Sequence, residues 1–309
     1  LKPRDVPTMY LKTFIILSLF TGFYFLVHNT QNIVLATLLS IVWGAVASMI
    51  GMGIMHDANH GGYSNNPTIN RVMGGLFDFI GGSSFCWKMI HSVGHHVSTN
   101  VDELDPDIHT NEPHFRRIKS SQKQHSWYKY QHLYLPFLYG ILVPELYFRD
   151  FPAMLLGKWG GVKFQPVTTK EWTIFWGCKV WVLIYALIIP TYCFPYGNWY
   201  RTLWLLGVLL TVASEILVLM FQVNHVTDLT DQFHTDNNQL TGIVKQDWAK
   251  SQVVGSSNFA TGSWLWNHLS GGLNHQTEHH LFPTICHVHY PALSKIVRKT
   301  CEEYGVRYN

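Results

Sequence analysis

Charged side chains are scarce in this sequence, and that scarcity excludes several classes of protein. Asp, Glu, Lys and Arg supply only 13% of the 309 residues, against roughly 25% in typical soluble domains. The formal net charge is a modest +3, and no basic run indicates a nucleic-acid partner. We therefore expect no nucleic-acid binding, and a chain that is not surrounded by water on all sides.

Cysteine is also sparse. The five cysteines include no Cys-x-x-Cys pair, which argues against a disulfide framework or a zinc ribbon. The sequence lacks a signal peptide with a cleavage site. It begins at Leu1 instead of an initiator Met, which is consistent with trimming from a longer sequence.

Four long apolar runs are present instead, at residues 10–27, 33–55, 172–193 and 203–221. A helix needs roughly 20 mostly apolar residues to cross a bilayer core, and each run approaches or exceeds that length. The sequence therefore predicts an all-α integral membrane protein with four transmembrane helices. In this interpretation residues 1–309 form one domain, and residues 56–171 and 222–309 form a helical cap that holds a histidine-rich dimetal site.

The distribution of positive charge places the cap on the cytosolic side. The stretch 56–171 carries 11 Lys and Arg residues and the part after Gln222 carries six, whereas the connections within the two pairs of runs contain only Arg201. Because cytoplasmic segments are enriched in Lys and Arg, the cap and both termini are predicted to be cytosolic. Two weaker apolar segments, Val72–Trp87 and Leu133–Phe148, are interrupted by Gly, Pro or acidic residues and are predicted to be interfacial or re-entrant.

Histidines are the most informative feature of the sequence. Neutral imidazole is the commonest side-chain metal ligand, and residues four apart, such as His56 and His60, share one face of a helix. A further candidate, His225, lies at the end of the fourth run. Independent placement seldom gives three such clusters, so we interpret them as parts of one metal site. The clusters are His56-Asp-Ala-Asn-His60, His91-Ser-Val-Gly-His95-His96 and Gln276-Thr-Glu-His279-His280.

Eight imidazoles are too many for one ion, since a structural zinc takes four ligands and a catalytic zinc commonly three. They fit two ions with coordination positions left open. Imidazole suits iron, zinc and copper, and the Glu-x-x-His pattern of helical-bundle di-iron proteins is absent, so the metal stays open at this point. Chemistry at a membrane surface indicates a lipid substrate, and a redox metal allows O2 activation.

The three clusters also resemble a known family. His-x-x-x-His, His-x-x-x-His-His and Gln-x-x-His-His are similar to the histidine boxes of the membrane fatty acyl desaturases. The Gln that opens the third box resembles the front-end branch, which inserts a double bond between an existing one and the carboxyl end. The string Gly271-Gly-Leu-Asn-His-Gln-Thr-Glu-His-His-Leu-Phe-Pro is the most specific part of the resemblance.

The resemblance implies two iron ions as cofactor, O2 as co-substrate, and a fatty acyl lipid or acyl-CoA as substrate. The expected location is the endoplasmic reticulum membrane, with the active site cytosolic. Gln276 binds a metal directly, acts through water, or orients a ligand. Candidates to orient ligands or contact substrate are Asp57, Asp105, Asn274, His275 and Trp264. The implied metal ligands are His56, His60, His91, His95, His96, His225, His279 and His280.

The electron donor is where the sequence departs from the family pattern. Many front-end relatives carry a fused cytochrome b5 domain with a His-Pro-Gly-Gly haem motif, and no such motif occurs here. Either that domain was cut away before Leu1, or electrons come from a separate cytochrome b5 or another reduced carrier. The boxes also leave open the position of the new double bond and the choice between acyl-CoA and phospholipid.

Three other functions fit part of the pattern. A di-iron lipid hydroxylase shares the boxes but adds oxygen to its product. A membrane zinc lipid amidase needs one zinc, no O2 and no electron donor. A metal carrier or sensor expects a path of intramembrane polar residues, and Lys179 with Glu215 makes a poor one.

Overall fold

The computed structural model describes residues 2–108, 115–118, 122–233, 235–236, 239–240 and 247–309. Helices dominate the described part of the chain, and its strands form two short antiparallel hairpins. The strands are β1 (Lys158–Trp159), β2 (Val162–Lys163), β3 (Thr235–Asp236) and β4 (Gln239–Leu240). The helices are α1 (Pro7–Asn29), α2 (Ile33–Met49), η1 (Ile50–Met55), α3 (His56–Asn59), α4 (Pro67–Gly74), α5 (Leu76–Phe79), α6 (Ser84–Trp87), η2 (Lys88–His95), η3 (Ser126–Tyr130), α7 (Gln131–Tyr139), α8 (Leu142–Leu156), α9 (Thr169–Leu183), η4 (Ile184–Ile188), α10 (Ile189–Tyr192), α11 (Trp199–His225), α13 (Trp248–Val254), α14 (Trp264–Leu269), η5 (Leu273–His275), α15 (Gln276–Leu281), η6 (His287–His289) and α16 (Tyr290–Glu303).

Four continuous helices are long and apolar enough to cross a membrane, and they confirm the four predicted runs. Each is longer than the run that predicted it: Pro7–Asn29, Ile33–Asn59, Thr169–Tyr192 and Trp199–His225. Local sequence explains where three of them begin. The side chains of Asn32, Thr168 and Asn198 accept hydrogen bonds from the first free N–H groups of α2, α9 and α11, which is the usual way to start a helix.

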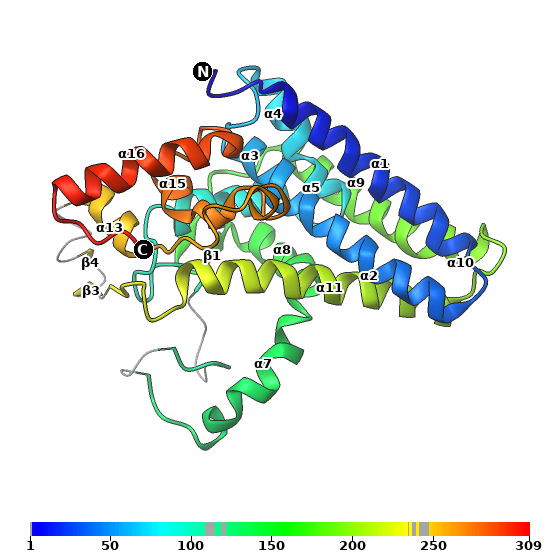
Figure 1. Ribbon diagram of the computed structural model, residues 1–309. Coiled ribbons are helices and arrows are strands. Elements are labelled where there is room, and N and C mark those ends of the chain that lie inside the picture. Colours follow the sequence, from blue (N-terminus) through cyan, green and yellow to red (C-terminus); the bar gives the residue numbers. More distant parts are fainter. Residues whose placement is uncertain (1, 109–114, 119–121, 234, 237–238, 241–246) are drawn as a thin grey trace.

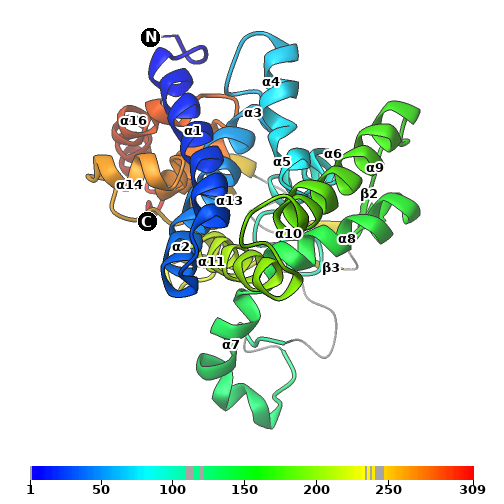
Figure 2. The ribbon, with the colours of Figure 1, turned by 90° about the vertical axis from the view of Figure 1, so that its right-hand side faces the viewer.

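The first, second and fourth spanning helices pack together through α2. It contacts both α1 and α11, and the views in Figures 1 and 2 show α1 on one side of it and α11 on the other. Gly44 permits the contact with α11, because a Cβ at this position would lie 2.7 Å from the carbonyl oxygen of Leu209. Trp43, Leu205 and Leu209 are buried in the hydrophobic core at this contact.

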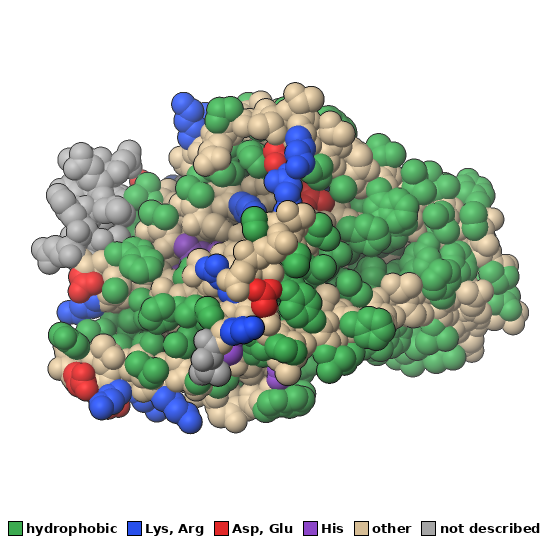
Figure 3. Space-filling model, turned by 90° about the horizontal axis from the view of Figure 1, so that it is seen from above, with side chains coloured by type: hydrophobic (Ala, Val, Ile, Leu, Met, Phe, Trp, Pro, Cys, Tyr) green, Lys and Arg blue, Asp and Glu red, His purple; other side chains and the backbone are tan. Residues whose placement is uncertain are grey.

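Hydrophobic and charged side chains separate along the molecule. Hydrophobic side chains cover the end that holds α10, while Lys, Arg, Asp and Glu gather towards the opposite end (Figure 3). Apolar residues of the spanning helices, such as Phe14 and Val180, are exposed. This distribution is that of an integral membrane protein with one polar cap.

The segments predicted to be interfacial or re-entrant form short helices. Val72–Trp87 falls on α4, α5 and α6, and Leu133–Phe148 on α7 and α8. No residue of α7 is buried, and α7 projects from the body in Figures 1 and 2. The following turn is held to the fourth spanning helix, where the backbone N–H of Val143 donates to Ser214 Oγ at 2.9 Å.

Candidate metal centre

Helices that are distant in the sequence bring the three histidine clusters together. His56 opens α3 at the end of the second spanning helix, η2 and its C-cap residue His96 carry the middle cluster, and α15 carries the last. The imidazole of His56 lies 4.4 Å from that of His279 between ring centroids, and His60 lies 4.5 Å from His96. The two crossings between the first and last clusters therefore return the chain to the same face.

The rings form two adjoining groups. In the first, His56, His60, His91 and His279 each offer a nitrogen within 4.8 Å of the others. In the second, His95, His225 and His280 do the same. His96 joins the groups, because its Nε2 is 3.2 Å from His91 Nε2 and 3.1 Å from His279 Nε2, while its ring stacks on His280 at 4.3 Å. All eight predicted histidines thus lie in one assembly.

A widened helical turn aims the middle cluster. The N–H of His96 donates to the carbonyl of His91, five residues earlier, at 3.0 Å, and η2 is a π-helix. In an α-helix of 3.6 residues per turn, positions five apart point roughly 140° apart, so both rings could not face one site. The π-turn brings them to the same side, and such turns are frequent at functional sites.

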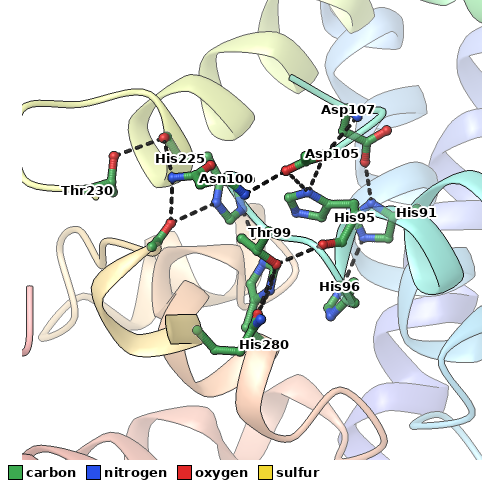
Figure 4. A network of polar contacts seen from close by, with 12 residues as sticks. His91, His95, His96, Thr99, Asn100, Asp105, Asp107, His225, Thr230 and His280 are labelled. Carbon is green, nitrogen blue, oxygen red and sulfur yellow. Dashed lines mark hydrogen bonds and ion pairs between the residues drawn. The ribbon is translucent and has the colours of Figure 1, made fainter. Parts of the chain in front are cut away.

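Two aspartates hold rings of the middle cluster from behind. Nδ1 of His91 donates to Asp107 Oδ2 at 2.8 Å, and Nδ1 of His95 donates to Asp105 Oδ2 at 2.9 Å (Figure 4). A carboxylate can only accept, so each imidazole carries its proton on Nδ1 and presents the Nε2 lone pair to the interior. Carboxylates in this position orient metal-binding histidines and raise their basicity.

The second group has neutral acceptors behind its other rings. Nδ1 of His280 lies 2.8 Å from Gln252 Oε1, which also accepts from Thr99 Oγ1 at 2.9 Å. Nδ1 of His225 faces the carbonyl of Gly255 at 3.3 Å. The same tautomer follows for these two rings, with Nε2 directed inward.

Asn100 ties the elements of the second group together. Its side-chain Nδ2 lies 3.0 Å from the carbonyl of His225, 3.1 Å from that of Asp231 and 2.9 Å from that of Gly255. Its backbone N–H donates to Asp105 Oδ2 at 2.8 Å, and its φ is +57°, a conformation that Asn tolerates better than most residues. Sequence reasoning missed Asn100 and Gln252, since neither falls in a histidine box.

Gln276 lies within the second group. Its Oε1 accepts from Asn224 Nδ2 at 3.0 Å, which turns its Nε2 towards His225 Nε2 at 2.8 Å and His280 Nε2 at 3.1 Å. In this orientation the amide nitrogen faces the ring lone pairs. A direct metal bond through the amide oxygen requires that side chain to turn over.

The arrangement fits metal ions. Nitrogens held by one metal at about 2.1 Å lie roughly 3.0–3.4 Å apart, and the Nε2 atoms of His225 and His280 are 3.2 Å apart. The NH2 group of Gln276 meets both of these lone pairs here, and a bound cation would take its place once that amide turns over. Nε2 of His60 and of His95 are buried with no hydrogen-bond partner. The residues present therefore suit metal binding, and they leave the choice of metal open.

Burial keeps most of these rings neutral. It lowers the pKa of His60, His96, His279 and His280 well below the ordinary value, and neighbouring imidazoles lower it further. His95 differs: burial opposes its charge, but Asp105 more than offsets burial and raises the pKa. Neutral imidazole is the form that binds metal, so most of the site is ready for a cation at neutral pH.

The other predicted candidates have different surroundings. Asp105 contacts His95 as described, but Asp57 contacts His287 instead of a predicted ligand, with Oδ2 2.8 Å from Nδ1. Asn274 bonds to Ser270 and Ala260. His275 is buried, and neither of its ring nitrogens has a hydrogen bond. Trp264 is 74% exposed, with its ring against His268.

A different tryptophan borders the first group. The indole of Trp87 stacks on His91 with centroids 4.4 Å apart, and it lies 5.4 Å from His56 and 5.3 Å from His60. Trp87 and His91 are four residues apart in continuous helix, and this spacing places them on the same face.

Comparison with known proteins identifies the family. The family model described as fatty acid desaturase matches residues 32–309. An acyl-lipid (8-3)-desaturase from Physcomitrium patens is 40% identical, over 100% of this chain and 64% of that protein. An acyl-lipid (8-3)-desaturase from Mortierella alpina is 35% identical, over 94% of this chain and 65% of that protein. An sn-1 linoleoyl-lipid 6-desaturase from Synechocystis sp. is 35% identical, over 100% of this chain and 85% of that protein. This chain spans just under two thirds of the first two relatives, and it belongs to the fatty acid desaturase family.

Proposed function

We propose that residues 1–309 form a single membrane domain that acts as a front-end fatty acyl desaturase. The reaction consumes O2 and two electrons and inserts a cis double bond towards the carboxyl end of a polyunsaturated acyl chain. The convergence of eight imidazoles in two adjoining groups carries this proposal. The relatives named acyl-lipid and linoleoyl-lipid desaturases support an acyl chain held in a lipid as the substrate.

Two iron ions are the proposed cofactor. The first group, His56, His60, His91 and His279, would hold one ion. The second group, His95, His225 and His280, would hold the other, with His96 between them. When bound, iron supplies the oxidising power needed to remove hydrogen from unactivated methylene carbons, which acid–base groups cannot do. Gln276 now occupies the Nε2 lone pairs of His225 and His280 with its amide nitrogen, so we propose that its amide turns over when the second ion binds and that its oxygen then faces the ion, directly or through water.

The protein's own contribution is position and exclusion of water. Asp105 and Asp107 fix the direction of His95 and His91, so the open coordination positions face a constant direction. Full burial of His95 keeps bulk water from that side. Trp87, at the edge of the first group, is proposed to contact the acyl chain. Holding one carbon–carbon bond beside the metals decides where the double bond forms.

The membrane arrangement follows from the same site. With the three boxes at one end of four spanning helices, electrons must enter from that side. The excess of Lys and Arg in the cap favours the cytosolic side, and an endoplasmic reticulum location is proposed with it. Cytochrome b5, fused or separate, or another reduced carrier is the proposed donor.

Expression with a cytochrome b5 partner in a host that lacks polyunsaturated fatty acids tests the function. Candidate precursor acids are supplied, and the products are analysed by mass spectrometry together with the metal content of the purified protein. A desaturase removes two hydrogens from the precursor and contains iron. Added oxygen in the product indicates a hydroxylase, and one zinc without O2 dependence indicates an amidase; either result refutes the proposal. His280→Ala, folded but without product and with less iron, is the matched control.

A further inference from the structure

A series of three hydrogen-bonded polar residues, Lys12, His287 and Asp57, lies beside the first group, and the last two of them are buried. Nζ of Lys12 donates to His287 Nε2 at 2.9 Å, and Nδ1 of His287 donates to Asp57 Oδ2 at 2.8 Å. The backbone N–H of His287 donates to the same carboxylate oxygen at 3.1 Å. His287 and Asp57 are 0% and 2% exposed in their side chains. Neither Lys12 nor His287 belongs to a histidine box.

The chemistry of the three side chains fixes which group donates each of these hydrogen bonds. A lysine ammonium only donates and a carboxylate only accepts, so the imidazole between them must carry its proton on Nδ1. One cation and one anion are thereby joined through a neutral ring. An ionisable residue within a spanning helix is costly and is by default a functional candidate, and Lys12 lies within the span Pro7–Asn29.

Two glycines leave space for the side chains of Lys12 and His287. A Cβ at Gly53 would lie 3.3 Å from Lys12 Nζ, and a Cβ at Gly272 would lie 2.4 Å from the Cβ of His287. Gly272 has φ +79°, which other residues rarely adopt. The close approach of these backbones to Lys12 and His287 leaves the two side chains little freedom.

Asp57, Cys286 and His287 lie close enough together to share a metal ion, so a metal site is the alternative to a role in hydrogen bonding. Lys12 removes that possibility. Its ammonium group takes the Nε2 lone pair of His287 at 2.9 Å, and a divalent ion among these residues would be repelled by that positive charge. The three residues act on the structure by hydrogen bonding.

The hydrogen bonds among Lys12, His287 and Asp57 hold helix α3, which begins at His56 of the first histidine box. Asp57 lies directly after His56 and three residues before His60 on α3. Its backbone carbonyl accepts from the N–H of Gly62 at 2.7 Å. Lys12 comes from α1 and His287 from η6, so one turn of helix is fixed from two sides by segments far apart in the sequence.

We propose that Lys12 and His287 are positioning residues that set the rotation of this turn, and hence the direction of the His56 and His60 rings, for the first metal. The inference rests on the proposed two-metal function. The second group has no described hydrogen bond to these three residues, since its rings rest on Asp105, Gln252 and Gly255. Loss of the hydrogen bonds among Lys12, His287 and Asp57 is therefore expected to weaken metal binding by the first group and not by the second.

Anaerobic titration of metal-free protein with Fe(II) in detergent tests the inference. Wild type is expected to bind two ions tightly. Lys12→Met is expected to keep one tight ion and bind the other about 10-fold more weakly, the lower end of the effect of residues that orient ligands. Thr13→Val is the matched control, because it removes a buried hydrogen bond, to Tyr63 at 2.9 Å, from the next residue of the same helix. It is expected to leave both affinities unchanged.

Substitution of the histidine gives the same comparison if Lys12→Met does not fold. His287→Gln keeps one donor and one acceptor between lysine and aspartate, and His287→Leu keeps neither. The glutamine variant is expected to retain more of the weakened affinity than the leucine variant. Equal binding by these two variants overturns the inference, as does an equal loss at both metal positions in Lys12→Met.

The double variant Lys12→Met/His225→Ala identifies the affected position. His225 belongs to the second group, so the double variant is expected to bind no ion tightly. One remaining tight ion means that Lys12 acts on the second group, and it overturns the inference. Failure of wild type to bind two ions contradicts the proposed function itself, which separates that outcome from failure of the positioning role.

Discussion

Replacing Asp105 with Asn is expected to loosen the second metal position while the helices stay folded. Asp105 is 0% exposed and its two oxygens serve three donors. His95 Nδ1 lies 3.0 Å from Oδ1 and 2.9 Å from Oδ2. The backbone N–H of Asn100 donates to Oδ2 at 2.8 Å, and that of Asp107 donates to Oδ1 at 3.0 Å.

The magnitude follows from this geometry. An amide has one oxygen, so in either orientation its NH2 group faces one of the two backbone N–H groups. At least one buried hydrogen bond to a charged acceptor is lost, which costs about 1.5–3 kcal/mol of unfolding free energy. The imidazole of His95 also loses its charged partner, and loss of such a partner weakens metal binding about 10- to 100-fold.

Fe(II) titration of metal-free Asp105→Asn, with urea unfolding in the same detergent, measures both effects. One of two tight ions should weaken by that factor. Asp107→Asn is the matched comparison: Asp107 contacts His91 of the first group, so the other ion should weaken instead. Glu171→Gln, which breaks an exposed pair with Arg71, should change neither affinity. Wild-type affinity for both ions in Asp105→Asn would falsify the role assigned to this carboxylate.

Three further outcomes are expected. Metal-free protein should lose stability as the pH falls below about 6.5, because unfolded histidines then bind protons while His60, His96, His279 and His280, with lowered pKa values, stay neutral. Each of these four histidines lowers the free energy of unfolding by up to about 1.4 kcal/mol per pH unit. The raised pKa of His95 offsets only part of this loss. An unfolding free energy that stays constant from pH 7 to pH 5 in urea contradicts the reasoning. Gly44→Ala should lower stability by about 1–3 kcal/mol, since the new Cβ meets the Leu209 carbonyl at 2.7 Å. Gly207→Ala, in open space, should not lower it, and equal melting temperatures for the two variants refute the close contact. Lys179→Met should cost about 3–5 kcal/mol by leaving Asp150, 3.3 Å from the ammonium group, buried and unpaired. Adding Asp150→Asn should recover part of that loss in thermal unfolding, and no recovery argues against the ion pair.

Much of the architecture could be predicted because it depends on local sequence. The spanning runs were recognisable by length and apolar character, and the structure has four helices at those positions. Their ends were less predictable: the fourth helix begins at Trp199, where Asn198 caps it, and it extends to His225. Capping depends on one side-chain oxygen, which a count of apolar residues does not detect.

The metal site could be predicted from the sequence only in part. Spacing within each box indicated that His56 and His60 share a helical face, and the boxes together indicated two metals. The sequence could not indicate that His96 lies between the two groups, because that depends on an i to i+5 turn in η2. It also gave Asp57 a ligand-orienting role, which stays a prediction, but it could not indicate that the partner of Asp57 is His287.

By itself, the sequence determined how much of this chain is apolar enough to enter a membrane and which histidines lie near its ends, since helix length and residue spacing are local quantities. Only the tertiary structure decided which imidazoles share a group and which residues hold them. Asn100 reaches His225 across 125 positions, and Lys12 reaches His287 across 275. Such partners are selected by the packing of whole helices, and no local pattern of residues records that packing.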